Sequence, residues 1–416
     1  MENFALIEKG KKSMKKIFSL ESLSKIKIMK NYIYNKNYRT SVINKIKNND
    51  NKRKIRNPGI DLVRILSMYA IIIHHILYFG NLFIKYNKYK ELVLMNISCF
   101  WHVNSYALIS GYIGYKSHKY SNLLFLWICV LFYSLSITYF FEKYKSEMNI
   151  DKIQFKDYFP VNFEKYWYFT KYFGMYLFLP VINKGIASMT NSDLRIVVIS
   201  LIFIYVILKD MINPKKDIYR IRNGNSVLWL LIYYIIGAYF GKFKKELNGI
   251  NRIILIVFCT FVFYFSTSIC FYFLNFPLDN LKGYFAIKAM KILKQLFVLR
   301  VSSVPMILQS ISITLILTHI NYNKYLSKII SFLGPLTFGV YLIHNNPIVI
   351  NKIFKKFFEN RPYNLSLYSI IKSVLIKGIK IYGICLIIDY LRLILFNLLR
   401  FKKICIFFEK CIYKIF

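Results

Sequence analysis

Side chains that could carry out chemistry are concentrated in one apolar stretch of the chain, residues 59–80. This stretch contains one acid, one arginine and two histidines: Asp61, Arg64, His74 and His75. Histidine is the usual general base near neutral pH, and arginine can hold a phosphate or another anionic oxygen with two parallel hydrogen bonds. Such a set suits the transfer of an acyl group from a phosphorylated carrier to a hydroxyl. On physical grounds it suits a proton-coupled transporter equally well.

The spacing places three of these residues on one face of a helix. Arg64 and His75 are eleven residues apart, about 20° from a whole number of turns, so they share a face ~16 Å apart along the axis. Asp61 is three residues before Arg64 and can pair with it, whereas His74 points roughly 100° away. A simpler interpretation is that the histidines only form hydrogen bonds to neighbouring helices. The pattern is compatible with that structural role and with a role in chemistry.

Polar side chains also interrupt two later apolar stretches. His102 and Asn104 lie in the first of these and need partners, so they either line a cavity or pair within the bundle. Tyr341 and His344 lie in the second and are three residues apart, which puts them on one helical face. We expect all four to support a site built around His75, with Tyr341 and His344 closing its cavity.

Aromatic residues gather at the start of another apolar stretch. They are Trp167, Tyr168, Tyr172 and Tyr176. Tryptophan and tyrosine are enriched where helices cross the membrane–water interface, so we interpret most of them as an interface belt. A wall that stacks on an acceptor sugar is the alternative.

Membrane helices must position these residues. Of the 416 residues, 56% are hydrophobic, more than the 45–50% typical of soluble domains. Apolar runs near twenty residues long recur without the alternation of a β-barrel. The last run carries Asp389 and Arg392 at a spacing that suits an internal ion pair. The sequence predicts an all-α bundle of about ten transmembrane helices, near residues 60–83, 92–114, 121–141, 167–187, 194–209, 227–241, 252–275, 299–318, 329–351 and 368–399.

The formal net charge of +40 is partly gathered in residues 1–57, which hold sixteen Lys and Arg against four acids. A basic segment before the first span is retained in the cytoplasm and attracted to anionic membrane lipids. An even helix count then places both termini there. No nucleic-acid-binding motif accompanies the charge, so we expect no nucleic-acid partner. We divide the chain into this tail, a transmembrane domain over 58–399 and a short basic tail over 400–416.

Several other chemistries are not indicated by the sequence. The seven cysteines are scattered, with no CxxC pair and no metal-binding spacing to histidine, so we expect no metal. The chain has no phosphate-binding loop, nucleophile elbow, HExxH or dinucleotide fingerprint, so we expect no bound cofactor. Any chemistry must therefore take place within the membrane bundle or at its surface.

Four motifs in the chain resemble those of the acyltransferase 3 family of bacterial membrane acyltransferases. They are IDLVRILSMYAIIIHH at 60–75, VNSYALISGY at 103–112, YWYFTKYFGMYLFLPVIN at 166–183 and LTFGVYLIH at 336–344. They follow the family's order over nearly the whole membrane region. The first resembles the family's pattern of an arginine followed after ten residues by a histidine. The resemblance implies that the domain over 58–399 is an acyltransferase domain.

The resemblance also implies roles for the site residues. His75 would be the catalytic base, acting with Arg64 and Asp61, and His74 would orient groups nearby. The donor would be acyl-CoA, usually acetyl-CoA, from the cytoplasm. Many members carry paired arginines after the second span, where this chain has Lys116 and Lys119. These lysines, with Arg64, would then contact the CoA phosphates.

The function implied is that of an O-acyltransferase of the bacterial cell membrane, most simply an O-acetyltransferase. In such proteins the acceptor is commonly a sugar of a lipid-linked or surface polysaccharide. The alternative is a proton-coupled transporter or flippase for a glycan precursor, in which the histidines relay protons.

Overall fold

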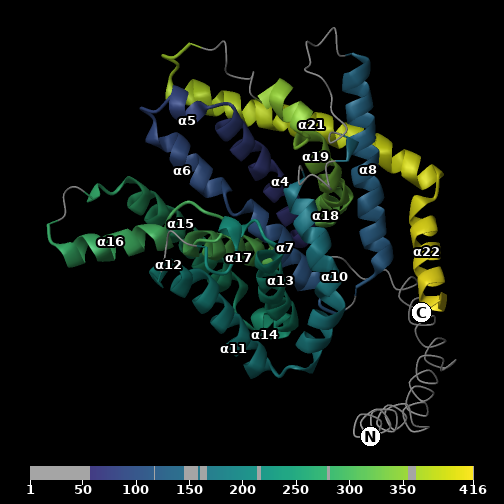
Figure 1. Cartoon of the computed structure of the whole chain (residues 1–416), viewed down its shortest axis with the longest axis horizontal. Helices are drawn as coiled ribbons and strands as arrows, with labels where there is room; N and C mark the ends of the chain where they lie inside the picture. Colours follow the sequence, from purple (N-terminus) through teal and green to yellow (C-terminus); the bar gives the residue numbers. More distant parts are fainter. Residues whose placement is uncertain are drawn as a thin grey trace, which may run out of the picture. The chain divides into compact units, whose positions relative to one another are not determined.

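Helices make up every regular element that the computed structural model describes (Figure 1). The described residues are 57–116, 118–144, 158–159, 166–212, 217–278, 282–354 and 362–415. The chain divides into two units, residues 1–56 with 410–416 and residues 57–409. The second unit contains all the residues discussed below. The predicted all-α membrane bundle is confirmed, whereas the predicted N-terminal tail, apart from Asn57, lies outside the described residues.

Among the described residues, five helical stretches are long and apolar enough to cross a membrane. They are α4 (Pro58–Phe79), α6 (Lys90–Cys99) with α7 (His102–Gly114), α8 (Tyr120–Lys143), α15 (Arg252–Asn275), and α18 (Lys324–Leu333) with α19 (Thr337–His344). Two apolar helices are shorter, α13 (Val227–Lys242) and α17 (Val304–His319). The other predicted spans correspond to α10 (Trp167–Ser188), to α11 (Asn191–Ile202) continuing through η1 (Phe203–Leu208) into α12 (Lys209–Ile212), and to α21 (Leu367–Leu398).

Short helices connect these elements. They are α5 (Leu82–Lys85), η2 (Arg222–Gly224), α14 (Lys244–Gly249), α16 (Tyr284–Leu296), η4 (Gly334–Leu336), α20 (Pro347–Val349), η5 (Ile350–Phe354) and α22 (Phe401–Ile415). The last of these occupies most of the predicted C-terminal tail.

Two predicted spans are broken in the structure. The span expected over 329–351 is interrupted by η4, because Pro335 lacks the backbone N–H that a continuous helix needs. The span expected over 92–114 divides at Phe100 and Trp101 into α6 and α7. No proline or glycine marks that second break, so no local signal in the sequence could have predicted it.

Helix α4 lies inside the bundle. It contacts α6, α7, α17, α18, α19 and α21, and in Figure 1 it is the dark purple helix surrounded by those elements. Its start is fixed by Asn57, whose Oδ1 accepts a hydrogen bond from the N–H of Gly59 at 2.8 Å. The same side chain donates through Nδ2 to the carbonyl of Thr318 in α17 at 3.0 Å. The start of α4 therefore lies beside the end of α17.

Helices α7 and α13 pack with their backbones in contact. A Cβ added to Gly237 of α13 would lie 1.9 Å from the carbonyl oxygen of Leu108, and one added to Gly111 of α7 would lie 1.9 Å from that of Tyr234. Only glycine fits where helices approach this closely. This contact fixes α7, which carries His102 and Asn104, against the rest of the bundle.

The expected ion pair in α21 is present and buried. Arg392 donates from Nε and Nη2 to the two carboxylate oxygens of Asp389 at 2.9 and 2.8 Å, and Tyr133 of α8 donates to Asp389 Oδ1 at 2.7 Å. Buried charges need such full pairing. This cluster therefore has a structural explanation and no spare group for chemistry.

Candidate active site

Four histidines from three helices meet in the bundle. The ring centroids of His74 and His75 in α4 are 5.8 Å apart, His102 of α7 lies 5.6 Å from His74, and His344 of α19 lies 5.4 Å from His75. Residues far apart in the sequence thus form one cluster. No group of histidine, cysteine or acidic residues in the described part of the chain is arranged to hold a metal ion.

The two adjacent histidines of α4 face different partners. His74 Nδ1 lies 2.8 Å from Asn96 Oδ1 of α6, and its ring packs against Phe100. His75 faces His344, and its Nδ1 is buried with no hydrogen-bond partner among the described residues. The simpler interpretation, a histidine hydrogen-bonded to a neighbouring helix, therefore fits His74 but not His75.

His344 presents an unused nitrogen to this cluster. Its Nδ1 lies 2.6 Å from the carbonyl oxygen of Val340, one turn earlier in α19. A carbonyl can only accept, so Nδ1 carries the proton and Nε2 carries the lone pair. That Nε2 is buried without a partner in the described structure. The His75–His344 pair can therefore accept and pass a proton in a place shielded from water.

The polar residues of α7 divide into two kinds. Both ring nitrogens of His102 are buried, and neither has a partner within the described residues. Asn104, in contrast, donates to the carbonyl of Val301 at 2.8 Å and accepts from Trp229 Nε1 at 3.0 Å. Asn104 therefore ties three segments together, while His102 remains able to contact a substrate.

Arg64 and Asp61 form the ion pair expected from their spacing. Arg64 Nη1 donates to Asp61 Oδ1 at 2.6 Å, with Asp61 fully buried and the Arg64 side chain 19% exposed. Gly334 packs so closely on Asp61 that an added Cβ would lie 2.6 Å from the carboxylate. Asp61 thus fixes Arg64 through Nη1, and a guanidinium has further N–H donors besides the one used in this pair.

A row of tyrosines runs along α10 toward the histidines. Neighbouring ring centroids are 6.0 Å apart for Tyr176 and Tyr172, 6.3 Å for Tyr172 and Tyr168, 6.5 Å for Tyr168 and Tyr341, and 6.4 Å for Tyr341 and His344. The hydroxyls of Tyr168 and Tyr341 are buried without partners in the described part of the chain. The interpretation of these α10 tyrosines as an interface belt is therefore wrong, because they face the interior of the bundle.

A cationic pocket lies at the end of the bundle where α4 begins, which we call the proximal end. Its volume is about 480 Å³, and it lies where α7, α10 and α13 end. Its lining residues are Tyr115, Lys116, His118, Pro180, Asn183, Lys184, Ile186, Ala187 and Lys242. The end of α7 lies beside the start of α4 because Tyr112 and Ile60 share a buried cluster. The pocket and Arg64 are therefore at the same end.

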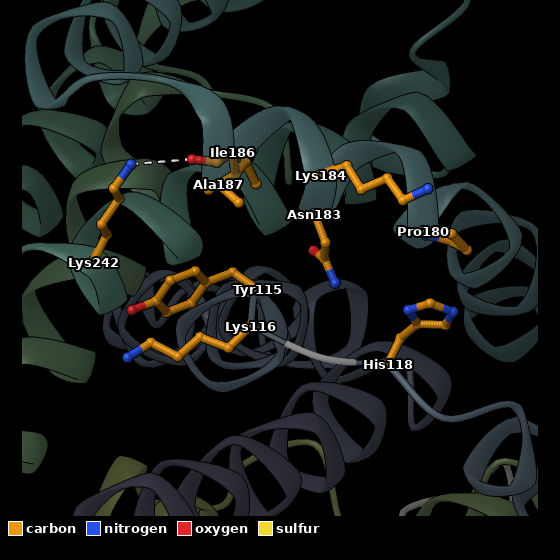
Figure 2. A pocket seen from close by; sticks show the side chains of 9 residues that line it. All are labelled: Tyr115, Lys116, His118, Pro180, Asn183, Lys184, Ile186, Ala187 and Lys242. Carbon is orange, nitrogen blue, oxygen red and sulfur yellow. Dashed lines mark hydrogen bonds between the residues drawn. The ribbon is translucent and has the colours of Figure 1, made fainter. Parts of the chain in front are cut away.

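The lysines of this pocket differ in how they are used. Lys242 donates to the carbonyls of Ile186 and Met189 at 3.1 and 2.7 Å, whereas Lys184 lies across the cavity from Lys116 in Figure 2. Burial lowers the pKa of His118, the charge of Glu409 acts in the opposite direction, and Lys184 adds to the lowering. The pocket therefore offers lysine ammonium groups to an anionic ligand.

Sequence reasoning found this pocket only in part. Lys116 lines it as expected, but Lys119 does not, and the backbone of Lys119 instead exchanges hydrogen bonds with the Tyr176 hydroxyl. Lys184 and Lys242 were missed. Their only signal was their position near the ends of two predicted spans, which any flanking lysine shares.

Comparison with protein-family models identifies the chain's family. The acyltransferase 3 model, described as an acyltransferase domain, matches residues 57–379, which is more than three quarters of the chain and contains every site residue named above. Neither the comparison with curated proteins nor that with solved structures finds a match. The chain therefore belongs to the acyltransferase 3 family and is a multi-pass membrane acyltransferase.

Proposed function

We propose that this acyltransferase moves an acyl group, acetyl in the simplest case, from acyl-CoA to a hydroxyl of a lipid-linked or surface glycan. The observation that carries the proposal is the His75–His344 pair, whose unpartnered nitrogens lie in the bundle interior. A buried base without a partner is costly to keep unless it meets a polar ligand. The acceptor hydroxyl is that ligand.

The donor binds from the proximal end. Lys116 and Lys184 attract the phosphates of CoA as point charges, and Arg64 holds an anionic oxygen nearer the reaction centre. The pocket volume of about 480 Å³ is within the usual range for ligand sites. We place this end, with both chain termini, in the cytoplasm of a bacterial cell, where acyl-CoA is present.

The tyrosine row marks the route of the acyl arm. It leads from Tyr176, beside Lys119, to His344. The unpartnered hydroxyls of Tyr168 and Tyr341 are placed to donate to the thioester carbonyl as negative charge develops on its oxygen.

In the reaction, His75 removes the proton from the acceptor hydroxyl as that oxygen attacks the thioester carbon. The new C–O bond forms, the C–S bond breaks, and the thiolate of CoA takes up the proton that His75 removed, which returns His75 to its neutral form. His344 Nε2 accepts a hydrogen bond from protonated His75 and so stabilises its positive charge. Asp61 holds Arg64 in place throughout.

The test is transfer of label from acetyl-labelled acetyl-CoA to the glycan fraction of a lipid extract by purified protein. We expect label in that fraction, and we expect Arg64→Ala to weaken donor affinity. Wild-type protein that binds acetyl-CoA in a separate measurement and yet transfers no label would contradict the proposal.

A further inference from the structure

A second cluster of charges lies at the other end of the bundle, which we call the distal end. Lys209 and Asp210 are in α12, and Arg300 is in the segment 297–303 that precedes α17. Arg300 Nη2 donates to Asp210 Oδ2 at 2.7 Å, and Lys209 Nζ lies 3.4 Å from Asp210 Oδ1. The side chains of Lys209, Asp210 and Arg300 are 6%, 1% and 17% exposed. Two buried cations thus share one carboxylate.

The excess positive charge is not balanced by another acidic side chain among the described residues. Neither Lys209 nor Arg300 has another acidic partner in the part of the chain that the structure describes. Within the described structure the polar contacts of Lys209 are long, at 3.4 Å to Asp210 and 3.4 Å to Ser302 Oγ. An uncompensated buried charge is costly, so this cluster is incomplete without an anion.

Donors for such an anion are present and unused. Arg300 Nε and the hydroxyl of Ser303 are both buried without a hydrogen-bond partner among the described residues. A guanidinium N–H, an ammonium group and a hydroxyl are each donors to the oxygens of a carboxylate or a phosphate, although Arg300 Nη2 is already used by Asp210 and by the carbonyl of Gln295.

The cluster is linked to the histidines by short contacts. The backbone carbonyl of Val301 accepts a hydrogen bond from the side chain of Asn104. Asn104 lies two residues after His102 in α7. Leu299 packs in one cluster with Phe100, and the Phe100 ring lies 5.0 Å from His74 and 5.8 Å from His102. The segment that carries Arg300 therefore lies beside His74 and His102, at the end of the bundle away from the donor pocket.

A loop that packs on the same segment adds two exposed arginines. Arg220 and Arg222 have φ values of 51° and 52°, a left-handed conformation that is strained for non-glycine residues. Gly224 of this loop packs so closely on Val301 that an added Cβ would lie 2.6 Å from its side chain. The loop thus brings further positive charge to the distal end.

We propose that Lys209 and Arg300 bind an anionic group of the acceptor, a sugar carboxylate or the phosphate of a lipid carrier, and so place its hydroxyl at His75. The assignment of this anion to the acceptor rests on the proposed function. The anion site itself is inferred independently of that function. The ligand class is therefore an acidic or phosphorylated glycan.

The experiment measures the thermal unfolding midpoint of the full chain in nanodiscs of phosphatidylcholine, with no acyl donor present. The probes are glucuronate, glucose 1-phosphate and neutral glucose. A ligand that binds only the folded state raises the midpoint, so we expect a rise with at least one anionic sugar and none with glucose. A larger rise with glucuronate identifies a sugar carboxylate, and a larger rise with glucose 1-phosphate identifies a phosphate.

Lys209→Met separates this role from a structural one. It leaves the Arg300–Asp210 pair neutral, so we expect a higher midpoint without ligand and an affinity for the anionic sugar that is about 10–100-fold weaker. Lys291→Met, in an exposed position of α16, is the control and should change neither property.

Two results would overturn the proposal. The first is equal midpoint shifts, or none, with all three sugars. The second is a Lys209→Met protein that is less stable than wild type yet keeps the full response to anionic sugar. Because no acyl-CoA is used, failure of label transfer and failure of the anion site can be told apart.

Discussion

For single residues, the adjacent histidines of α4 show that position around the helix axis determines which partner each side chain meets. One residue of rotation, roughly 100°, directs His74 to Asn96 and His75 to His344. The same phase predicted the Asp61–Arg64 pair. The distance from His75 to His344 could not be predicted, since it depends on how α4 and α19 pack.

His344 is expected to contribute to catalysis through its free Nε2. His344→Asn keeps a side-chain donor near Val340 but removes the imidazole lone pair, so the transfer rate should fall about 10-fold or more. Acyl-CoA affinity should not change. Both are measured with the labelled-donor assay and a binding titration.

Loss of acyl-CoA affinity with an unchanged transfer rate at saturation would contradict that role. His74→Asn is the matched control, because His74 already uses Nδ1 on Asn96, and it should reduce the rate less than His344→Asn does.

The pocket lysines are expected to act on donor binding alone. Replacing Lys116 and Lys184 together with Met removes two charges from the phosphate pocket, and acyl-CoA affinity should fall about 10-fold or more. The transfer rate at saturating donor should remain. The affinity of wild type should also weaken with added salt, and that of the double variant much less.

The matched control is Lys244→Met in α14, because Lys244 lies outside the pocket lining. This variant should bind acyl-CoA with unchanged affinity. An unchanged acyl-CoA affinity in the double variant would contradict a role of the pocket in donor binding.

At the scale of elements, the sequence predicted which segments are helices better than where they break. The run over 58–79 is recognisable from its length and apolar composition. The break between α6 and α7 was not, because it brings His102 beside His74 through tertiary packing rather than a local helix breaker. The α10 tyrosines were misassigned because tyrosines at a membrane interface and tyrosines facing the bundle interior cannot be told apart by composition. Tertiary packing decides between them.

The close contact of α7 with α13 is expected to depend on glycine. In Gly237→Ala the new methyl group would lie 1.9 Å from the Leu108 carbonyl oxygen, so the helices must separate. Overpacking of this kind costs about 1–3 kcal/mol. The thermal unfolding midpoint in detergent should therefore fall.

Gly185→Ala in α10 is the matched control, because an added Cβ there meets nothing within 4 Å. It should leave the midpoint unchanged or raise it slightly, since alanine favours a helix over glycine. Equal midpoints for the two variants would show that the α7–α13 contact is not tight.

In the whole molecule, the proposed donor pocket and the proposed acceptor site lie at opposite ends of one bundle. Lys184 is at the proximal end of α10, and Arg220 follows α12 at the distal end. A cysteine replacing Lys184 should react with an impermeant maleimide only after the membrane is permeabilised. A cysteine replacing Arg220 should react in intact cells. Labelling of both from the same side would contradict the arrangement.

His75→Gln removes the proposed catalytic base and leaves a polar side chain in its place. The measurement is label transfer from acetyl-labelled acetyl-CoA to glycan at saturating donor, with acetyl-CoA affinity measured on the same protein. General-base catalysis is worth about 10²–10⁴-fold, so we expect the transfer rate to fall at least 100-fold with unchanged donor affinity. Full transfer by a folded His75→Gln protein would contradict it.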